Sequence, residues 1–196
     1  IANTCNADGV EKAELMCSLA AEATGLKSAD FVVASTGVIG QPINIEPIKN
    51  GLPELVTELS VNGSSNAAEA IMTTDTVKKE FAVEFNLGGK ICKIGAISKG
   101  SGMIHPNMAT MLCFITTDAN IESKMLKSAL LDVVDDSFNM LSVDGDTSTN
   151  DTVAILASGK AENKRIEEKN DDYNTFVSAL AAISEKIVKL MAKDGE

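Results

Sequence analysis

A strongly apolar run that follows directly on a turn-rich loop is the feature that most constrains the fold of this chain. Residues 110–116, Thr-Met-Leu-Cys-Phe-Ile-Thr, are almost uninterruptedly apolar and rich in β-forming residues, which predicts a strand buried on both faces. The loop before it contains Gly100, Gly102 and Pro106, and these residue types supply bends and unusual backbone angles. A hydroxyl residue, Thr110, therefore stands where an irregular loop enters the core.

Cleavage of the backbone before Thr110 would create a reactive group. If the bond between Ala109 and Thr110 were broken, the new α-amine would lie beside the threonine hydroxyl. That arrangement activates a threonine nucleophile without a histidine, because the amine acts as the base. A threonine at the start of a buried strand is also a common structural feature, so the position alone leaves both interpretations open.

The composition bounds the class of protein and its partners. The 196 residues are 44% hydrophobic, which is enough for one globular domain with a sizeable core and no disulfides. A net charge of −11 argues against a nucleic-acid partner, since proteins that bind phosphate backbones concentrate positive charge. No apolar stretch reaches transmembrane length, so we expect no membrane partner.

The cysteines indicate a reducing compartment rather than a metal site. Cys5, Cys17, Cys92 and Cys113 contain no Cys-x-x-Cys pair, and His105 is the only histidine, so a zinc cage of familiar spacing is absent from the sequence. Reduced thiols are the usual state in a cytoplasmic protein. We therefore expect a cytoplasmic location.

Predicted helices and strands alternate along the rest of the chain. Helical spacing covers residues 8–25, 47–59, 64–71, 122–141 and 175–193, and short buried strands are expected over residues 30–35 and 153–157. Asp8 and Glu11 suggest a capping box for the first helix. Alternating residues on either side of Gly88 and Gly89 predict a β-hairpin over residues 81–98. This alternation predicts a layered α/β protein with helices outside stacked sheets.

A polar loop at residues 144–151, Asp-Gly-Asp-Thr-Ser-Thr-Asn-Asp, invites a calcium assignment that its spacing does not support. An EF-hand loop that started at Asp144 would place Thr149 where the glycine belongs and Ile155 where the bidentate glutamate belongs. A loop whose Asp and Ser/Thr side chains bond to nearby backbone, and support the nucleophile from behind, fits the sequence better.

Two long motifs resemble the ornithine acetyltransferase family of arginine biosynthesis, also called the glutamate N-acetyltransferase family. The first is Lys-Gly-Ser-Gly-Met-Ile-His-Pro-Asn-Met-Ala-Thr-Met-Leu at residues 99–112, and the second is Val-Asp-Gly-Asp-Thr-Ser-Thr-Asn-Asp-Thr-Val at residues 143–153. The resemblance spans essentially every residue of the chain. It implies self-cleavage between Ala109 and Thr110, after which Thr110 serves as the nucleophile.

The same resemblance implies roles for further residues. Thr36 and Gly37, within Ser-Thr-Gly-Val-Ile-Gly at residues 35–40, would form the oxyanion hole. The substrate contacts would come from Thr73 (with Thr74 as the neighbouring candidate), Lys99, Thr110 and Glu196. No metal and no organic cofactor would be needed.

The implied fold is an α-β-β-α sandwich that is similar to N-terminal-nucleophile hydrolases with different connectivity. The chain would be one globular domain that lacks both ends of a longer precursor. Residues 1–109 would belong to the α chain and residues 110–196 to the β chain after cleavage. The fragments would stay interlocked and associate as an α2β2 heterotetramer.

The implied activity is the transfer of an acetyl group from N2-acetylornithine to glutamate through an acetyl-threonine intermediate. The motifs leave open whether acetyl-CoA is also a donor. An alternative is a self-processed aminopeptidase or amidase, in which water replaces glutamate as the acceptor. A third hypothesis, from another class, is a non-catalytic metal-binding module built on residues 144–151.

Overall fold

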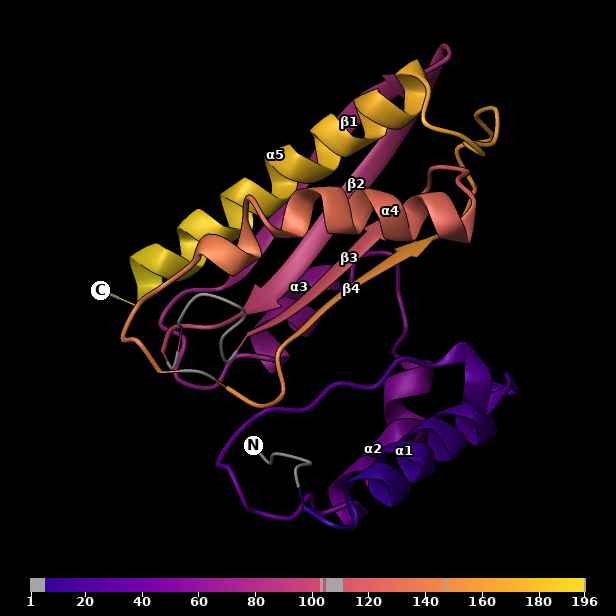
Figure 1. The fold of residues 1–196 in the computed structure, drawn as a ribbon. Helices are drawn as coiled ribbons and strands as arrows, with labels where there is room; N and C mark the ends of the chain where they lie inside the picture. Colours follow the sequence, from indigo (N-terminus) through magenta and orange to yellow (C-terminus); the bar gives the residue numbers. More distant parts are fainter. Residues whose placement is uncertain (1–5, 103, 105–110, 147, 196) are drawn as a thin grey trace.

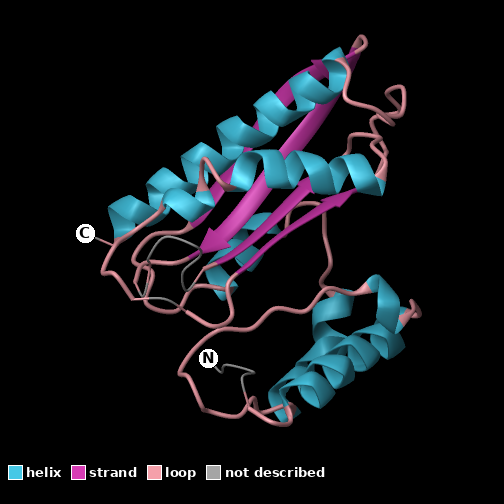
Figure 2. Ribbon diagram, viewed as in Figure 1, coloured by secondary structure: helices cyan, strands magenta, loops and turns pink. Residues whose placement is uncertain are grey.

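A four-stranded sheet with two helices on one face forms the centre of the molecule in the computed structural model, which describes residues 6–102, 104, 111–146 and 148–195 (Figures 1 and 2). The helices are α1 (Gly9–Thr24), α2 (Glu46–Thr57), α3 (Ser64–Ala70), α4 (Ser123–Val134) and α5 (Asp171–Asp194), with short 3-10 turns at Ser28–Asp30 and Phe138–Met140. The strands are β1 (Lys79–Leu87), β2 (Lys90–Lys99), β3 (Leu112–Thr117) and β4 (Thr152–Ala157). The layered α/β class predicted from the sequence is confirmed.

The sheet has the order β1-β2-β3-β4, with antiparallel pairing up to β3 and parallel pairing between β3 and β4. Gly88 and Gly89 connect β1 to β2 with φ angles of 55° and 88°. A two-residue hairpin turn with positive φ at both positions favours glycine, because its twist matches that of the strands. The predicted hairpin is therefore confirmed. The parallel β3 and β4 are joined through α4, as parallel neighbours require a crossover.

The hydrophobic core lies between the sheet and the pair α4 and α5, which cross the same face of the sheet (Figure 1). Alternate residues of the strands point into it, and α5 contributes its wholly buried face: Cys92, Ile94, Cys113, Ile115, Phe176, Leu180, Ile183, Ile187 and Met191. Burying one such aliphatic or aromatic side chain stabilises a fold by about 1.5–3 kcal/mol. Burial also raises the pKa of the Cys113 thiol to about 12, so Cys113 behaves as a small apolar residue, as its sequence context predicts.

The opposite face of the sheet is more open than the sequence predicts. In β3, Phe114 is only half-buried and Thr116 is exposed, so this strand is not buried on both faces. The described residues contain one of the two sheets of the expected sandwich, with the short helix α3 near β1 and β2. A cavity of about 240 Å³ lies over this face and is lined in part by Phe114 and Thr116.

Helices α1 and α2 pack against each other, away from α4 and α5 (Figure 1). Helix α1 ends where expected, at Gly25, whose φ of 75° is left-handed and whose N–H donates to the Ala21 carbonyl. The predicted capping box is wrong: the Asp8 side chain makes no cap hydrogen bond, and its carboxylate pairs with Lys12 Nζ at 2.8 Å instead. Asp8 therefore pairs with Lys12, one turn into the helix, and not with a backbone N–H of the first turn.

Two other predicted elements differ from the structure. Residues 30–35 form no strand, although Phe31 has extended backbone angles, because an extended segment becomes a strand only when another strand pairs with it. The helix expected over residues 122–141 stops at Val134. Its continuation is broken at Ser137, where the backbone leaves the helical region and the hydroxyl donates to the Val133 carbonyl at 2.7 Å.

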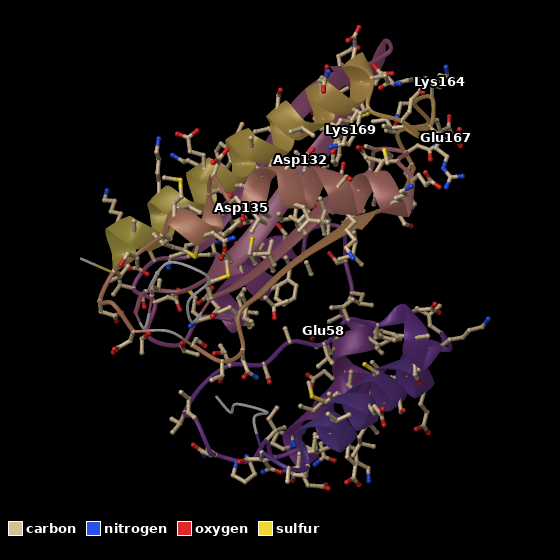
Figure 3. The ribbon with its side chains drawn as sticks, viewed as in Figure 1. Glu58, Asp132, Asp135, Lys164, Glu167 and Lys169 are labelled. Carbon is tan, nitrogen blue, oxygen red and sulfur yellow. The ribbon has the colours of Figure 1, made fainter. Side chains whose placement is uncertain are left out.

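A polar contact at the edge of the core joins α4 to α5, and Figure 3 labels its Asp132 and Lys169. Asp132 accepts hydrogen bonds from Lys169 Nζ at 2.8 Å and from the Tyr173 hydroxyl at 2.7 Å. The exposed Lys169 end of this contact limits its worth, because solvent screens surface ion pairs. Within the described ranges, no helix combines the length and apolar composition that a membrane crossing requires.

Candidate active site

A cavity of about 640 Å³ brings together three segments that carry predicted site residues. Thr36 comes from the segment after α1, Thr73 from the segment after α3, and Leu112 opens β3; all three line the cavity. Apolar side chains make up much of the remaining wall, including Met16, Ile43, Ile48 and Ile71. Leu112 is the second residue after Thr110, so the cavity adjoins the strand that the expected nucleophile precedes.

Three of the predicted site residues lie outside the described residues: Ala109, Thr110 and Glu196. The cleavage site and the nucleophile therefore stay predictions from the sequence. The described neighbours of these positions are Met111, which follows Thr110, and Gly195, which precedes Glu196.

The Thr36 hydroxyl is a buried donor on the cavity wall. The residue is only 7% exposed, and among the described residues nothing forms a hydrogen bond with its Oγ1. Leaving a buried polar group unpaired costs roughly 1–3 kcal/mol, so such a group suits a site where a ligand completes the bond. Gly37 has a φ of 154°, in a backbone region that residues with a side chain rarely adopt.

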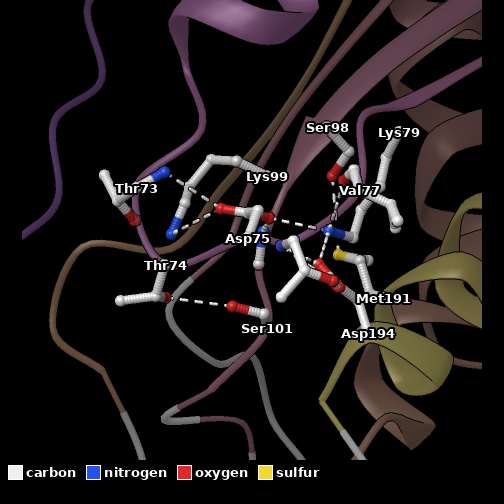
Figure 4. Close-up of polar contacts among 12 residues, drawn as sticks. Thr73, Thr74, Asp75, Val77, Lys79, Ser98, Lys99, Ser101, Met191 and Asp194 are labelled. Atoms are coloured by element: carbon white, nitrogen blue, oxygen red, sulfur yellow. Dashed lines mark hydrogen bonds and ion pairs between the residues drawn. The ribbon is translucent and has the colours of Figure 1, made fainter.

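The structure places Thr73, rather than Thr74, on the wall of the cavity. The backbone N–H of Thr73 donates to Asp75 Oδ2 at 3.1 Å (Figure 4). The Thr74 hydroxyl instead lies 3.0 Å from the hydroxyl of Ser101. Thr74 thereby connects its own segment to the loop after β2.

Lys99 ends β2 and is 3% exposed. It pairs with Leu112 across the two strands, and residues directly opposite one another in a sheet have side chains on the same face. Lys99 therefore lies on the cavity side of the sheet. Its Nζ is 3.8 Å from Asp75 Oδ2. Burial lowers the pKa of Lys99 below its ordinary value, and the attraction of Asp75 offsets part of that effect.

Asp75 is a site residue that the sequence motif contains but that sequence reasoning did not single out. Its Oδ1 accepts from the Gly100 N–H at 2.6 Å and from Lys79 Nζ at 2.7 Å, while Oδ2 accepts from the N–H of Thr73. Burial alone would raise the pKa of Asp75. The hydrogen bonds from Gly100, Lys79 and Thr73 outweigh it, so the pKa lies below its ordinary value of 3.8.

Lys79 and Asp194 continue this network to the end of α5. Lys79 is wholly buried, and its Nζ also lies 2.5 Å from Asp194 Oδ2. The Asp194 carboxylate accepts from the Thr76 N–H at 3.1 Å and from the Thr76 hydroxyl. Burial raises the pKa of Asp194, but its bonds with Lys79 and Thr76 lower it by more. Sequence reasoning missed both residues.

The polar loop of the second motif holds the backbone on either side of residues 105–110. Asp144 Oδ1 accepts from the Ile104 N–H at 2.8 Å, and Asp151 Oδ1 accepts from the Met111 N–H at 2.8 Å. Burial raises the pKa of Asp151, and its hydrogen bonds with Met111 and the loop offset part of that rise. Asp144 also accepts from the N–H of Asp146, as the sequence predicts. The described part of the chain contains no group of three or more His, Cys, Asp or Glu side chains positioned to hold a metal ion.

A model of the ArgJ family matches residues 1–196, the whole of this chain. The chain belongs to the ArgJ family. Among its ArgJ relatives, the arginine biosynthesis bifunctional protein ArgJ of Symbiobacterium thermophilum is 50% identical over 196 residues, which are 100% of this chain and 49% of that protein. ArgJ 1 of Clostridium acetobutylicum is likewise 50% identical over 196 residues, 100% of this chain and 48% of that protein.

The family suggested by the two motifs is thereby confirmed. This chain spans about half the length of the curated ArgJ relatives that it matches. The crystal structure of the arginine biosynthesis bifunctional protein ArgJ from Bacillus halodurans is 46% identical to it, with a TM-score of 0.41 over 42% of this chain and 39% of that one.

Proposed function

We propose that this chain carries the acetyl-transfer site of an enzyme that moves an acetyl group from N2-acetylornithine to glutamate in arginine biosynthesis. Membership of the ArgJ family and the names of the ArgJ relatives support the pathway. The observation that carries the proposal is the cavity, because it joins Thr36, Thr73 and the start of β3. A concave site with a few convergent polar groups is the usual form of a small-molecule site.

In the proposed reaction, self-cleavage first hydrolyses the peptide bond between Ala109 and Thr110, with water supplying the new Ala109 carboxyl oxygen, and frees the Thr110 α-amine. The Thr110 hydroxyl then attacks the acetyl carbonyl of acetylornithine while its proton passes to that α-amine. The carbon–nitrogen bond to ornithine breaks, the ornithine nitrogen takes the proton, and an acetyl ester on Thr110 remains. The amine of glutamate attacks this ester, forms acetylglutamate and returns a proton to the Thr110 oxygen.

Thr36 and Gly37 are the proposed oxyanion donors. Negative charge develops on the acetyl oxygen in both steps, and preorganised donors aimed at such charge often lower the reaction barrier more than any other single effect. The buried hydroxyl of Thr36 forms no hydrogen bond with any described residue. This hydroxyl and the N–H of Gly37 are suited to the role. The position of Thr36 on the wall of a largely apolar cavity strengthens the electrostatic effect.

Thr73, Lys99 and Glu196 are the proposed contacts for the amino-acid part of each substrate. The Lys99 ammonium is held on the cavity side of the sheet and could form a charge-assisted hydrogen bond with a substrate carboxylate. Glu196 would offer a carboxylate to a substrate amine. Residues 1–109 and 110–196 would remain associated after cleavage, in an α2β2 assembly.

The experiment that tests this function uses protein produced from the complete gene. A denaturing gel should resolve two fragments, and sequencing of the C-terminal fragment should begin with Thr-Met-Leu-Cys. Incubation with N2-acetylornithine and glutamate should then yield acetylglutamate and ornithine. Release of acetate without acetylglutamate would favour the amidase alternative. Replacing acetylornithine with acetyl-CoA in the same assay decides whether acetyl-CoA is a donor.

A further inference from the structure

A lysine that the proposed reaction does not use is buried between two carboxylates beside the site. Lys79 has no exposed surface, and its Nζ lies 2.7 Å from Asp75 Oδ1 and 2.5 Å from Asp194 Oδ2 (Figure 4). The Val77 carbonyl accepts a third hydrogen bond from the same nitrogen at 3.2 Å. All three ammonium hydrogens therefore have partners, which leaves Lys79 no donor for a substrate.

Lys79 and Asp75 together connect the two faces of the sheet. Lys79 pairs with Ser98, which lies on the helix-covered face, because Ser98 Oγ contacts Met191 of α5 at 3.4 Å. Lys99, the next residue along β2, lies on the opposite face with the cavity, since successive side chains of a strand alternate between faces. Asp75 reaches both lysines because its carboxylate sits beyond the end of β2, at the N–H of Gly100.

The carboxylates of Asp75 and Asp194 bind backbone N–H groups as well as the Lys79 ammonium. Asp75 accepts from the N–H groups of Thr73 and Gly100, and Asp194 accepts from the N–H of Thr76. Lys79 joins these two carboxylates. Three segments that are far apart in the sequence, at Thr73–Thr76, Lys99–Gly100 and the end of α5, are thus held in one arrangement.

A buried ion pair is weak evidence for stability, because desolvation of the charges offsets their attraction. In some proteins such a pair instead specifies one geometry among several. The packing beside this ion pair also tolerates little displacement: a Cβ on Gly195 would come within 2.7 Å of Val143 Cγ1 and 3.0 Å of the Ser101 carbonyl oxygen. The end of α5 is therefore held both by the ion pair of Asp194 and by close packing of Gly195 against Val143 and Ser101.

We propose that Asp75, Lys79 and Asp194 form a positioning cluster, which sets the end of α5 and the Thr73 and Lys99 segments at the spacing that an amino-acid substrate requires. This inference rests on the proposed acetyl transfer, because Thr73 and Lys99 are proposed substrate contacts there. The positioning cluster touches neither Thr36 nor Gly37 among the described contacts. Its loss is therefore expected to weaken the binding of glutamate more than the chemical step.

The test variant is Asp194→Asn in protein produced from the complete gene. Asparagine keeps the shape of the side chain and can still accept from Thr76, but it removes the charge that Lys79 faces. The KM for glutamate should rise by about 10- to 100-fold, the range expected when a hydrogen bond to a charged group is lost. The kcat should stay within about threefold, because uniform binding affects KM alone.

Two matched controls lie on the same helix. Ile187→Val shortens a wholly buried side chain of α5 and lowers stability without touching the positioning cluster. Glu185→Gln removes an exposed ion pair with Lys189. Neither should change the KM for glutamate. A milder variant, Thr76→Val, removes the hydroxyl that donates to Asp194 and leaves every buried charge in place, so it should raise the KM by a smaller factor and serves if Asp194→Asn does not fold.

The outcomes separate the inference from the proposed function. A raised KM in Asp194→Asn or Thr76→Val, with both controls unchanged and self-cleavage intact, supports the positioning cluster. If Asp194→Asn and Thr76→Val both fold and their KM values are unchanged, or if only kcat falls, the positioning cluster is overturned. Activity of the unmodified protein still upholds the proposed function in that case. If the unmodified protein forms no acetylglutamate, the proposed function fails and the inference fails with it.

Discussion

Among the described site residues, Thr36 is the one whose removal should act most directly on the reaction step. Thr36→Ala deletes a buried hydroxyl that lines the cavity, and loss of one oxyanion donor typically lowers kcat by roughly 100- to 1000-fold. The KM should change little, since the oxyanion forms only in the transition state. Steady-state kinetics should compare kcat and KM of Thr36→Ala with those of Thr36→Ser, which keeps the hydroxyl. A raised KM with an unchanged kcat would remove Thr36 from the oxyanion hole.

Asp75 and Asp194 should make the folded state sensitive to acid. Burial raises the pKa of each, but hydrogen bonds from Lys79 and the backbone bring both below the ordinary value of 3.8. A carboxyl whose pKa is lower in the folded state stabilises the fold above its unfolded pKa and loses that contribution as pH falls through its folded pKa. The free energy of unfolding should therefore fall steeply below about pH 4. Denaturant titrations at several pH values should give a shallower fall for Asp194→Asn, and an equally steep fall would contradict the assignment.

The sequence could predict some site residues but not the contacts that hold them. Thr36, Thr73 and Lys99 lie in short motifs with a family resemblance, and the structure places all three on or beside the cavity side of the sheet. The contact between Lys79 and Asp194 crosses 115 positions. A lysine at the start of a strand and an aspartate at the end of a helix have no local pattern that distinguishes a buried pair from two solvated charges.

Helix α5 is the element whose loss of packing should cost the most stability. Ile187 is wholly buried in α5 against the sheet, and truncating such a side chain leaves a cavity as well as removing apolar contact. Ile187→Ala should lower the free energy of unfolding by about 2–5 kcal/mol. Val10→Ala is a suitable control, because Val10 is 74% exposed and should change stability by less than about 0.5 kcal/mol. Equal effects of the two substitutions on urea denaturation would refute this account of the core.

Elements with strong local signals were predictable, whereas elements that depend on distant partners were not. The glycine turn between β1 and β2 and the apolar spacing of α5 fix those elements locally, and both match the structure. Residues 30–35 have strand-like composition, but no described strand pairs with them. The register of β3 beside β4, parallel with Leu112 opposite Thr152, is likewise set by the crossover through α4 rather than by either strand alone.

At the scale of the whole molecule, the described residues leave apolar surface exposed that another protein surface could cover. Large apolar side chains are exposed outside the core: Val10, Leu26, Val32, Val38, Leu59 and Val61 are each at least 57% exposed. The face of the sheet opposite α4 and α5 is also open at Thr116 and half-open at Phe114. Exposed apolar surface of this kind favours association when it is contiguous, and this chain spans about half the length of the curated relatives that it matches.

Residues 1–196 produced alone should therefore self-associate and transfer no acetyl group, whereas protein from the complete gene should be uniform in size and active. Without a cover for the open face, nothing prevents two sheets from packing together, and the cavity that joins Thr36, Thr73 and Leu112 would not keep the roughly 0.5 Å tolerance of a preorganised site. Light scattering coupled to size-exclusion chromatography measures the association, and the acetylglutamate assay on the same fractions measures transfer. A monodisperse 1–196 chain with turnover near that of the longer protein would overturn this prediction, and would mean that the described cavity together with residues 105–110 suffices for the reaction.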